Sequence, residues 1–383
     1  QEKQRGTGDA VNAARSKLAD GNSTVLVLSG DVPLIGRDTL RELIAVHKLE
    51  NAACTVLTVR LDDPFGYGRI IRSESGFERI VEQKDATDAE REVAEINSGI
   101  YCFDSKKLFE ALGKVRTDNA QGEYYLTDVP RHLLDAGETV ALFLHDEPVE
   151  VEGVNDRVQL AAIAKMINDE TIEKLMTESG VTFIDPRNAY ISSTASIGRD
   201  TVIYPNVTIE GDTMIGANCV IRSGSRLSNA TVGDNVEIRD NCLIIDSEIG
   251  NGCSVGPMAH LRGHAVMVEG AKVGNFVEMK KSRLGKNSKA AHLTYLGDAT
   301  VGEDTNIGAG VITCNYDGKN KHETHIGDRV KIGSDTMLVA PVNIGDDAST
   351  GAGSVVTKDV APGELVVGVP AKSKIVRANE EKA

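Results

Sequence analysis

Aliphatic residues in the C-terminal half of the chain recur at every sixth position. Six successive examples are Ile197, Ile203, Ile209, Ile215, Ile221 and Leu227. A period of six fits neither the period of two of a strand nor the period of 3.6 of a helix. It is typical of a parallel β-helix, in which each aliphatic side chain points inward and three hexads close one coil. The pattern therefore predicts a parallel β-helix over about residues 197–344.

One interruption of this repeat predicts where a ligand binds. Between Thr313 and His325 the hexads stop, and the segment TCNYDGKNKHETH intervenes. An insertion into a regular coil has to loop outward. Loops on a rigid scaffold are the segments that most often contact ligands. We therefore expect a site close to this insertion.

The N-terminal half alternates between strand and helix patterns instead. We expect helices over residues 9–18, 40–49 and part of 124–136, strands over 24–29, 54–59 and 99–103, and a hairpin of 68–72 with 77–82. The run TVLVLS at 24–29 is continuously apolar, as a buried parallel strand would be. Such alternation predicts an α/β sheet.

A long helical pattern at residues 156–179 separates the two halves. Leu160, Ile163, Ile167 and Met176 are spaced to share one face of this helix. No partner pattern accompanies it, so we interpret it as a connecting arm. The expected division is residues 1–155 for the first domain, 156–180 for the linker helix and 181–383 for the β-helix domain.

Composition narrows the classes of partner. The net charge of −15 and the pI of about 5.1 argue against binding to nucleic acid or to an anionic membrane. The six cysteines form no CxxC pair, so we expect reduced, mostly buried thiols in a cytoplasmic protein. No run of 18 apolar residues is present, so we expect no membrane span. Small anionic ligands remain compatible with this acidic composition, since a few well-placed cationic side chains are enough to bind them.

Candidate chemistry gathers near the break in the repeat. Arg262, Lys280 and Lys281 place cations in an acidic protein, where they are suited to holding a phosphate. His292 lies in AAHLTYLG, and an imidazole can take a proton from an amine near neutral pH. A lone histidine is more often packed or solvated. Its position beside the insertion favours the catalytic interpretation.

The sequence around these residues resembles a known family. The runs GNFVEMKKSRLG (274–285) and HLTYLGDATVGEDTNIGAGVITCNYDGKNK (292–321) are similar to the bifunctional N-acetylglucosamine-1-phosphate uridyltransferase / glucosamine-1-phosphate N-acetyltransferases. So are GTGDA, SGDVPL, DPFGYGRI, IVEQKDAT, EINSGI and VEGVNDR in the N-terminal half, and the resemblance covers essentially the whole chain. It implies a Rossmann-like α/β nucleotidyltransferase sheet, N-terminally truncated, followed by a left-handed parallel β-helix.

The resemblance also implies a function. The family acetylates glucosamine-1-phosphate with acetyl-CoA, and then transfers uridylyl from UTP to N-acetylglucosamine-1-phosphate with release of pyrophosphate. The product, UDP-N-acetylglucosamine, feeds peptidoglycan and lipopolysaccharide precursors. The family further implies a homotrimer whose sites lie between subunits.

In the β-helix half, the resemblance assigns roles to individual positions. His292 matches the general base. The acetyl acceptor would be held by Arg262, Lys280, Tyr295, Asn306 and Lys321. Acetyl-CoA would be contacted by Ala309, Asn315, Tyr316, Ser334 and Ala352. The family's further arginine in the tail has no clear match, since Lys372 is a different residue type and Arg377 lies late.

In the N-terminal half, the resemblance implies a Mg²⁺ site made by Asp31 and Asn155. The positions that match contacts to the UDP-sugar are Gln1, Gly6, Thr7, Ser29, Gly30, Asp31, Gly68, Glu82, Asn97 and Asn155. The family's Gly-rich loop, which cradles the triphosphate, would precede Gln1 and is absent from the printed sequence. We therefore expect impaired uridylyl transfer from the chain as printed, and a complete acetyltransferase half.

Three alternatives remain open from the sequence. In the first, the β-helix serves only as a scaffold for a sugar nucleotidyltransferase, which predicts no turnover of acetyl-CoA. A metal-dependent hydratase would need several histidines to share a metal between subunits, and the positions of His260, His264 and His292 fit that poorly. A purely structural trimer would leave the insertion and the cations unexplained.

Overall fold

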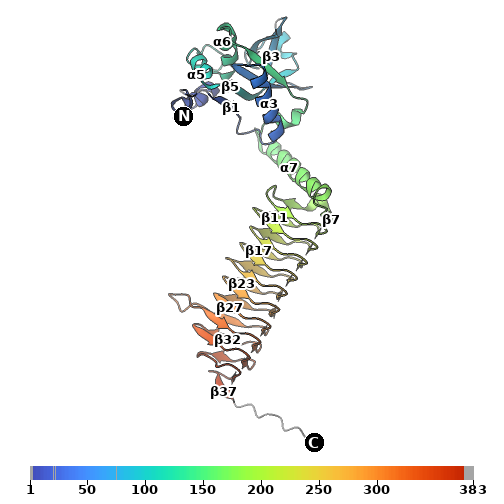
Figure 1. Cartoon of the computed structure of the whole chain (residues 1–383), viewed down its shortest axis with the longest axis vertical. Coiled ribbons are helices and arrows are strands. Elements are labelled where there is room, and N and C mark those ends of the chain that lie inside the picture. Colours follow the sequence, from blue (N-terminus) through green and yellow to red (C-terminus); the bar gives the residue numbers. More distant parts are fainter. Residues whose placement is uncertain (1–2, 20, 22, 75, 375–383) are drawn as a thin grey trace. The chain divides into compact units, whose positions relative to one another are not determined.

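The computed structural model describes residues 3–19, 21, 23–74 and 76–374. The chain divides into two compact units, Gln1–Ala164 and Lys165–Ala383. Figure 1 shows an α/β unit at the N-terminal end and a stack of short strands in the C-terminal unit.

The first unit is built on a six-stranded sheet. Its strands are β1 (Thr24–Val27), β2 (Cys54–Arg60), β3 (Gly68–Ser73), β4 (Gly76–Val81), β5 (Glu95–Asp104) and β6 (Val140–Leu144). The order is β4-β3-β5-β2-β6, and β1 pairs with β5 off this path. Strands β2 and β6 pair in parallel, whereas β1, β2 and β3 all run antiparallel to the long β5.

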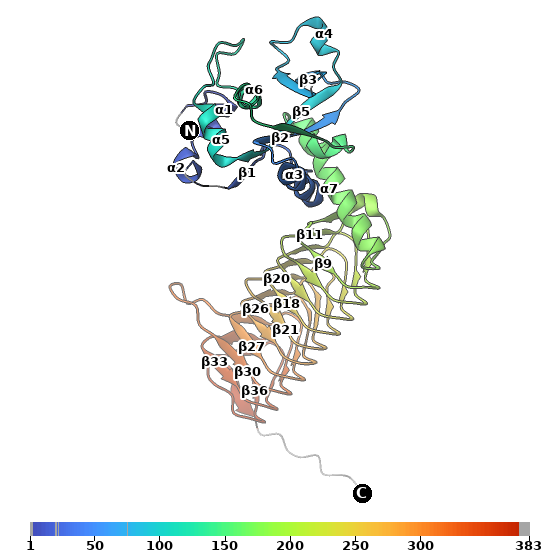
Figure 2. The same cartoon turned by 45° about the horizontal axis from the view of Figure 1, so that its top comes forward.

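Helices cover both faces of this sheet. They are α1 (Thr7–Asn12), α2 (Arg15–Leu18), α3 (Arg37–Leu49), α4 (Asp88–Arg91), α5 (Ser105–Leu112) and α6 (Val129–Asp135), with the 3₁₀ segments η1 (Leu126–Asp128) and η2 (Pro148–Val151). Successive residues of a strand point to opposite faces. Accordingly, Tyr101 and Phe103 pack with α5 and α6, whereas Ile100 packs with Leu43 of α3. Figure 2 shows α3 and α5 on opposite sides of the sheet.

Most of the predicted elements of this unit are confirmed, with two corrections. The helix expected over 9–18 is split into α1 and α2. The strand expected over 24–29 as a buried parallel strand is β1, which runs antiparallel to β5 and is half-buried at most. An apolar run alone cannot distinguish a buried parallel strand from a half-buried antiparallel strand, because both use the same apolar side chains. The partner of the strand decides its direction and its burial.

The C-terminal unit is a parallel β-helix with three faces. The first face contains β7 (Thr182–Phe183), β10 (Val202–Ile203), β13 (Val220–Ile221), β16 (Glu237–Ile238), β19 (Ser254–Val255), β22 (Lys272–Asn275), β25 (Lys289–His292), β28 (Asn306–Ile307), β31 (Lys331–Ile332), β34 (Ser349–Thr350), β36 (Leu365–Val367) and β37 (Lys372–Lys374). The second contains β8 (Tyr190–Ile191), β11 (Thr208–Glu210), β14 (Arg226–Ser228), β17 (Leu243–Ile245), β20 (His260–Arg262), β23 (Glu278–Lys280), β26 (Tyr295–Gly297), β29 (Ile312–Cys314), β32 (Met337–Val339) and β35 (Val355–Val356). The third contains β9 (Ser196–Ile197), β12 (Met214–Ile215), β15 (Thr231–Val232), β18 (Glu248–Ile249), β21 (Val266–Met267), β24 (Arg283–Leu284), β27 (Ala299–Val301), β30 (Thr324–Ile326) and β33 (Val342–Ile344).

The six-residue period predicted this stack correctly. All six aliphatic residues quoted for it are at most 5% exposed. Ile203 pairs with Ile221 one coil further on, which is the expected spacing of 18 residues. The interior residues join in one continuous apolar cluster along the coils, so each coil is stabilised by its neighbours.

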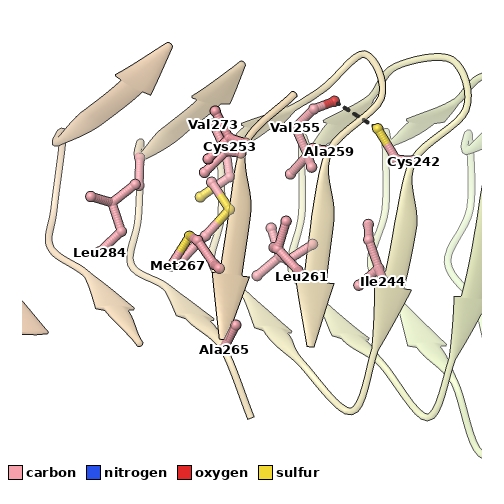
Figure 3. Close-up of a cluster of buried hydrophobic side chains, with 14 of the residues drawn as sticks. Cys242, Ile244, Cys253, Val255, Ala259, Leu261, Ala265, Met267, Val273 and Leu284 are labelled. Carbon is pink, nitrogen blue, oxygen red and sulfur yellow. Dashed lines mark hydrogen bonds between the residues drawn. The ribbon is translucent and has the colours of Figure 1, made fainter. Parts of the chain in front are cut away.

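Cysteines form part of this interior. Figure 3 shows Cys242, Cys253 and their aliphatic neighbours pointing into the coils, with the Cys242 thiol donating to the carbonyl of Val255 at 3.6 Å. Burial raises the pKa of the Cys253 thiol to about 11. All six cysteines are free, and all but the half-buried Cys314 are buried. The prediction of mostly buried, unbridged cysteines is therefore confirmed.

Helix α7 (Arg157–Thr177) confirms the long helical pattern but not its single apolar face. Ile163 is buried, whereas Leu160 is 42% and Met176 is 43% exposed. Ile172 and Leu175 join the β-helix core instead. The two ends of α7 pack in different units, so no one stripe of side chains is buried along its length. Among the described residues, no helix combines the length and hydropathy needed to cross a bilayer.

Candidate functional site

His292 is held by an asparagine from the preceding coil. Strands β22 and β25 pair so that Asn275 lies opposite His292, and His292 Nδ1 lies 2.7 Å from Asn275 Oδ1. A carbonyl oxygen only accepts, so Nδ1 carries the proton and Nε2 keeps its lone pair. The exposed imidazole is therefore oriented as a base. Nothing in the local sequence pattern singled out Asn275, and only its place one coil before His292 would have indicated it.

The backbone around this pair is closely packed. A Cβ at Gly274 would lie 1.8 Å from the carbonyl oxygen of Ala291, so only glycine fits before Asn275. The carbonyl of His292 accepts from Thr294 Oγ1 at 2.8 Å and from the Gly310 amide at 3.3 Å. These contacts hold the backbone of His292 at the corner between the first and second faces.

Cations line the second face next to this corner. Arg262, Lys280 and Gly297 occupy the same position on three successive coils. Arg262 Nη2 forms an ion pair with Glu278 Oε1 at 2.6 Å. The neighbouring Lys321 ammonium, followed by partial burial, lowers the pKa of Lys280. An anionic ligand would relieve the repulsion between these two ammonium groups, so the pair is suited to a phosphate.

Tyr295 covers the position that follows these cations on the next coil. A Cβ at Gly297 would lie 2.3 Å from the Tyr295 hydroxyl oxygen, so the ring covers the space that a side chain at 297 would fill. Gly297 in turn follows Lys280 in register. The glycine therefore allows the phenol to lie beside the cation column, where it can contact a bound sugar.

The insertion is an outward loop, as predicted, and it is visible as the orange loop between β29 and β30 in Figure 1. Asn315 at its start is only 7% exposed, and its Nδ2 donates to Asp298 Oδ2 at 2.5 Å. Tyr316 is 61% exposed and pairs across the loop with Lys321. Asp317 Oδ1 accepts from the amides of Lys319 and Asn320, each at 2.7 Å, which shapes the loop tip.

Three of the five positions expected to contact acetyl-CoA form a column. Ala309, Ser334 and Ala352 follow the first-face strands of three successive coils. A Cβ at Gly308 would lie 2.6 Å from the Ser334 amide nitrogen, so the coils stack tightly along this column. Asn306 is exposed on the first face, between the in-register Lys289 and Lys331.

One chain places these residues in two groups around one corner. His292 and Asn275 end first-face strands, whereas Arg262, Lys280 and Tyr295 belong to the second face. Within the described chain, no hydrogen bond or ion pair joins the histidine to the cations. In the tail, Lys372 is exposed on β37, and Arg377 lies outside the described residues.

In the first unit, three expected sugar contacts meet. A Cβ at Gly68 would lie 3.7 Å from both Asn97 Cβ and Glu82 Cδ. Burial raises the pKa of Glu82, although Thr127 Oγ1 donates to its carboxylate at 2.9 Å. Glu82 lines a cavity of about 580 Å³, together with Tyr125, Thr127, Lys114, Arg116 and others. The volume suits a small polar ligand such as a sugar phosphate.

A buried arginine shapes the loop before Gly68. Arg69 is 1% exposed, and its guanidinium donates to the carbonyl oxygens of Tyr67 and Arg91 and to Gln83 Oε1. Gln83 Oε1 also accepts from the Gly66 amide at 3.2 Å. Arg69 and Gln83 therefore hold this loop against the segment that follows β4 and carries Glu82. Neither residue was expected from the sequence to have a role.

Asp31 and Asn155 also lie close together. The Val154 amide donates to the Asp31 carbonyl at 2.8 Å, and a Cβ at Gly153 would lie 3.9 Å from both Asn155 Nδ2 and the Asp31 carbonyl oxygen. Both side chains are exposed, and they offer the hard oxygen donors that Mg²⁺ prefers. Among the described residues, no group of three or more His, Cys, Asp or Glu side chains is placed to hold a metal. A sparse pair that leaves room for phosphate oxygens fits Mg²⁺.

The remaining expected nucleotide contacts are spread over neighbouring segments. The Leu126 amide donates to Thr7 Oγ1 at 3.0 Å, and Gly6 packs on the backbone of Tyr124. Ser29 Oγ would lie 3.0 Å from a Cβ at Gly99 of β5, and Gly30 precedes Asp31 in the turn after β1. Gln1 lies outside the described residues.

Comparison with known proteins matches both units. The family described as "Nucleotidyl transferase" matches residues 1–148, "GMPPB C-terminal domain" matches 184–289 and "Bacterial transferase hexapeptide (six repeats)" matches 323–358. The curated "Bifunctional protein GlmU" of Syntrophomonas wolfei is 48% identical over 96% of this chain and 81% of its own length. Those of Pelobacter propionicus and Shouchella clausii are each 49% identical, over 96% and 94% of this chain and 80% and 79% of their own lengths.

These matches and the geometry confirm the expected fold class. It is a nucleotidyltransferase-type α/β domain followed by a hexapeptide-repeat, left-handed parallel β-helix. The matched relatives align across both units and the helix between them.

Proposed function

The chain belongs to the family of bifunctional GlmU proteins, and we propose that its two units catalyse the two steps that make UDP-N-acetylglucosamine. The β-helix transfers acetyl from acetyl-CoA to the amine of glucosamine-1-phosphate. The α/β unit transfers uridylyl from UTP to N-acetylglucosamine-1-phosphate and releases pyrophosphate. The product supplies cell-wall precursors.

The observation that carries the acetyl-transfer proposal is the hydrogen bond between His292 Nδ1 and Asn275 Oδ1. It leaves Nε2 free to remove a proton from the substrate amine as the nitrogen attacks the thioester carbon. The tetrahedral intermediate collapses, the carbon–sulfur bond breaks, and the sulfur leaves as coenzyme A and takes up a proton. Atoms and charge balance without a covalent enzyme intermediate.

Substrate positions follow from the same geometry. Lys280, Lys321 and Arg262 hold the phosphate of the acceptor, and Tyr295 contacts its sugar ring, as does Asn306. The acyl donor lies along Ala309, Ser334 and Ala352 and reaches Asn315 and Tyr316 in the insertion. Support comes from the close approach of the Lys280 and Lys321 ammonium groups and from the column of tightly stacked coils. The Asn315 amide stabilises the acyl oxygen as charge develops on it.

For uridylyl transfer we propose that Asp31 and Asn155 hold Mg²⁺. When bound, the ion neutralises charge on the nucleotide phosphates. Gly68, Glu82 and Asn97 bind the N-acetyl sugar, because Asn97 and Glu82 both lie close to Gly68, and Glu82 also lines the cavity beside Thr127. Thr7 and Gly6 lie against the chain at residues 124–126. This position suits contacts to the base of the nucleotide.

We further propose that the active assembly is a homotrimer. The histidine group and the acyl-donor column lie on one side of a corner, and the acceptor cations lie on the other. Apolar side chains are also left half-buried on the second face of one chain, namely Leu243, Ile245, Ile312 and Met337. A neighbouring copy would cover them and complete the site. Mass measurement in solution checks this, and a monomer with full acetyltransferase activity contradicts it.

The experiment that tests the function is replacement of His292 by alanine. Loss of a general base lowers the rate by about 10²–10⁴-fold. We expect that loss in an assay of thiol release from acetyl-CoA with glucosamine-1-phosphate. His325→Ala is the matched control, because His325 is also an exposed histidine of the β-helix, and it lies on the third face. Unchanged acetyl transfer in a folded His292→Ala protein would favour a scaffold role for the β-helix.

A further inference from the structure

Asp298 occupies the corner between β26 and β27, next to the insertion. Its φ is +48°, a left-handed conformation that Asp and Asn tolerate better than most residues. Its amide donates to the carbonyl of Lys280 at 3.0 Å, and its carbonyl accepts from the Thr324 amide at 3.1 Å. The backbone of Asp298 therefore joins the coil of the cations to the end of the insertion.

The side chain of Asp298 contacts the other end of that insertion. Its Oδ2 accepts from Asn315 Nδ2 at 2.5 Å, and Asn315 is only 7% exposed. A hydrogen bond to a carboxylate is short and strong, and it is stronger still when shielded from water. One N–H of the Asn315 amide is thereby committed to Asp298. The rotation of the amide is thus set, and with it the direction of its remaining N–H and of its oxygen.

We propose that Asp298 is a positioning residue of the acetyl-transfer site, which aims the Asn315 amide at the acyl donor and couples the insertion to the phosphate-binding cations. This inference rests on the proposed function of the β-helix. Asp298 touches no substrate itself, since it acts through Asn315 and Lys280.

Charge gives the second part of the inference. Lys321 and partial burial lower the pKa of Lys280, whereas the carboxylate of Asp298 acts in the opposite direction and raises it. Asp298 therefore helps to keep Lys280 protonated beside a second ammonium group. One side chain thus influences both the donor and the acceptor parts of the site.

The chain offers a matched control at another corner. Asp304 has a φ of +51°, and its Oδ1 accepts from Asn287 Nδ2 at 3.2 Å. This Asp–Asn pair has the same spacing of 17 residues as Asn315 and Asp298, but it is exposed, and Asp304 lies at a different corner, between β27 and β28. If both Asp–Asn contacts only stabilise a corner of the β-helix, removal of the carboxylate should have the same effect on the protein at Asp298 and at Asp304.

The test compares three variants of the full chain. Asp298→Gly removes the carboxylate and tolerates the left-handed backbone. Asp298→Asn keeps an acceptor oxygen and removes the charge, and Asp304→Gly is the control. We expect Asp298→Gly to lower kcat/KM for acetyl-CoA by about 10–100-fold, because a small misplacement of a positioned group can lower the rate to this extent. Asp298→Asn should retain most of the parental kcat/KM for acetyl-CoA, and Asp304→Gly should leave this kcat/KM unchanged.

The pH dependence separates positioning from folding. Without the carboxylate, Lys280 loses its proton at lower pH. In both Asp298 variants, the KM for glucosamine-1-phosphate should therefore begin to rise at lower pH than in the parent. Equal thermal shifts in Asp298→Gly and Asp304→Gly, with unchanged kinetics and pH profile, would overturn the proposal. Retention of full acetyl transfer by His292→Ala would instead refute the proposed function itself.

Discussion

The two units bring site residues together in different ways. In the β-helix, Asn275 and His292 lie 17 residues apart, and Arg262 and Lys280 lie 18 apart, so each pair is one coil apart in register. In the α/β unit, Asp31 and Asn155 meet although 155 − 31 = 124 residues separate them. A repeat converts spacing in the sequence directly into contact. An α/β site requires the whole sheet to be assembled first.

The cores differ in the same way. One continuous cluster runs through the β-helix, with contacts between successive coils. The sheet of the first unit separates two clusters, one with α3 and the other with α5 and α6. Stability in the first unit thus depends on both faces of one sheet, whereas in the β-helix it depends on each pair of neighbouring coils.

The largest expected effect tests this difference directly. Leu227→Ala and Leu57→Ala each remove a side chain that is 0% exposed, and each should cost about 3 kcal/mol. Calorimetry should show Leu227→Ala lowering only the transition of the β-helix, and Leu57→Ala lowering only that of the α/β unit. Met214→Ala, at a position 52% exposed, serves as the control. A single transition that both core variants shift equally would show that the units unfold together.

An intermediate effect is expected at Asn275. Asn275→Ala removes the acceptor that orients His292 and should lower kcat for acetyl transfer by about 10–100-fold. Asn275→Asp keeps an acceptor oxygen and should stay closer to the parent. Asn343→Ala on β33 removes a comparable exposed asparagine, whose Nδ2 donates to Asp359 at 3.2 Å, and should not change the rate. An Asn275→Ala enzyme of parental kcat would exclude a role in orienting the base.

The smallest effect concerns pH. Lys321 is the main cause of the lowered pKa of Lys280, so the KM for glucosamine-1-phosphate should rise as pH increases through that lowered value. In Lys321→Met the pKa of Lys280 returns toward its ordinary value, and the rise should begin at higher pH. Near neutral pH the loss of one exposed cation should weaken binding by no more than about five-fold. If the pH profile of this KM does not shift in Lys321→Met, Lys321 does not influence the protonation of Lys280.

Part of the site was predictable and part was not. The hexads located the coils, and the break after Thr313 located the loop that carries Asn315. Arg262 was expected as a cation for phosphate, but its ion pair with Glu278 was not foreseen. Nor were the support of His292 by Asn275 and the burial of Arg69, because each depends on side chains that meet only across coils or strands.

The sequence by itself determined the period, and the period determined the coil, because an interior that accepts one small aliphatic residue per side leaves little choice of register. It also placed the insertion and the histidine beside it. Only the tertiary structure decided the antiparallel direction of β1, the changing buried face of α7 and the partners of each charged side chain. The physical reason is that burial patterns are local, whereas strand direction, ion pairing and hydrogen bonding depend on which distant residue arrives opposite.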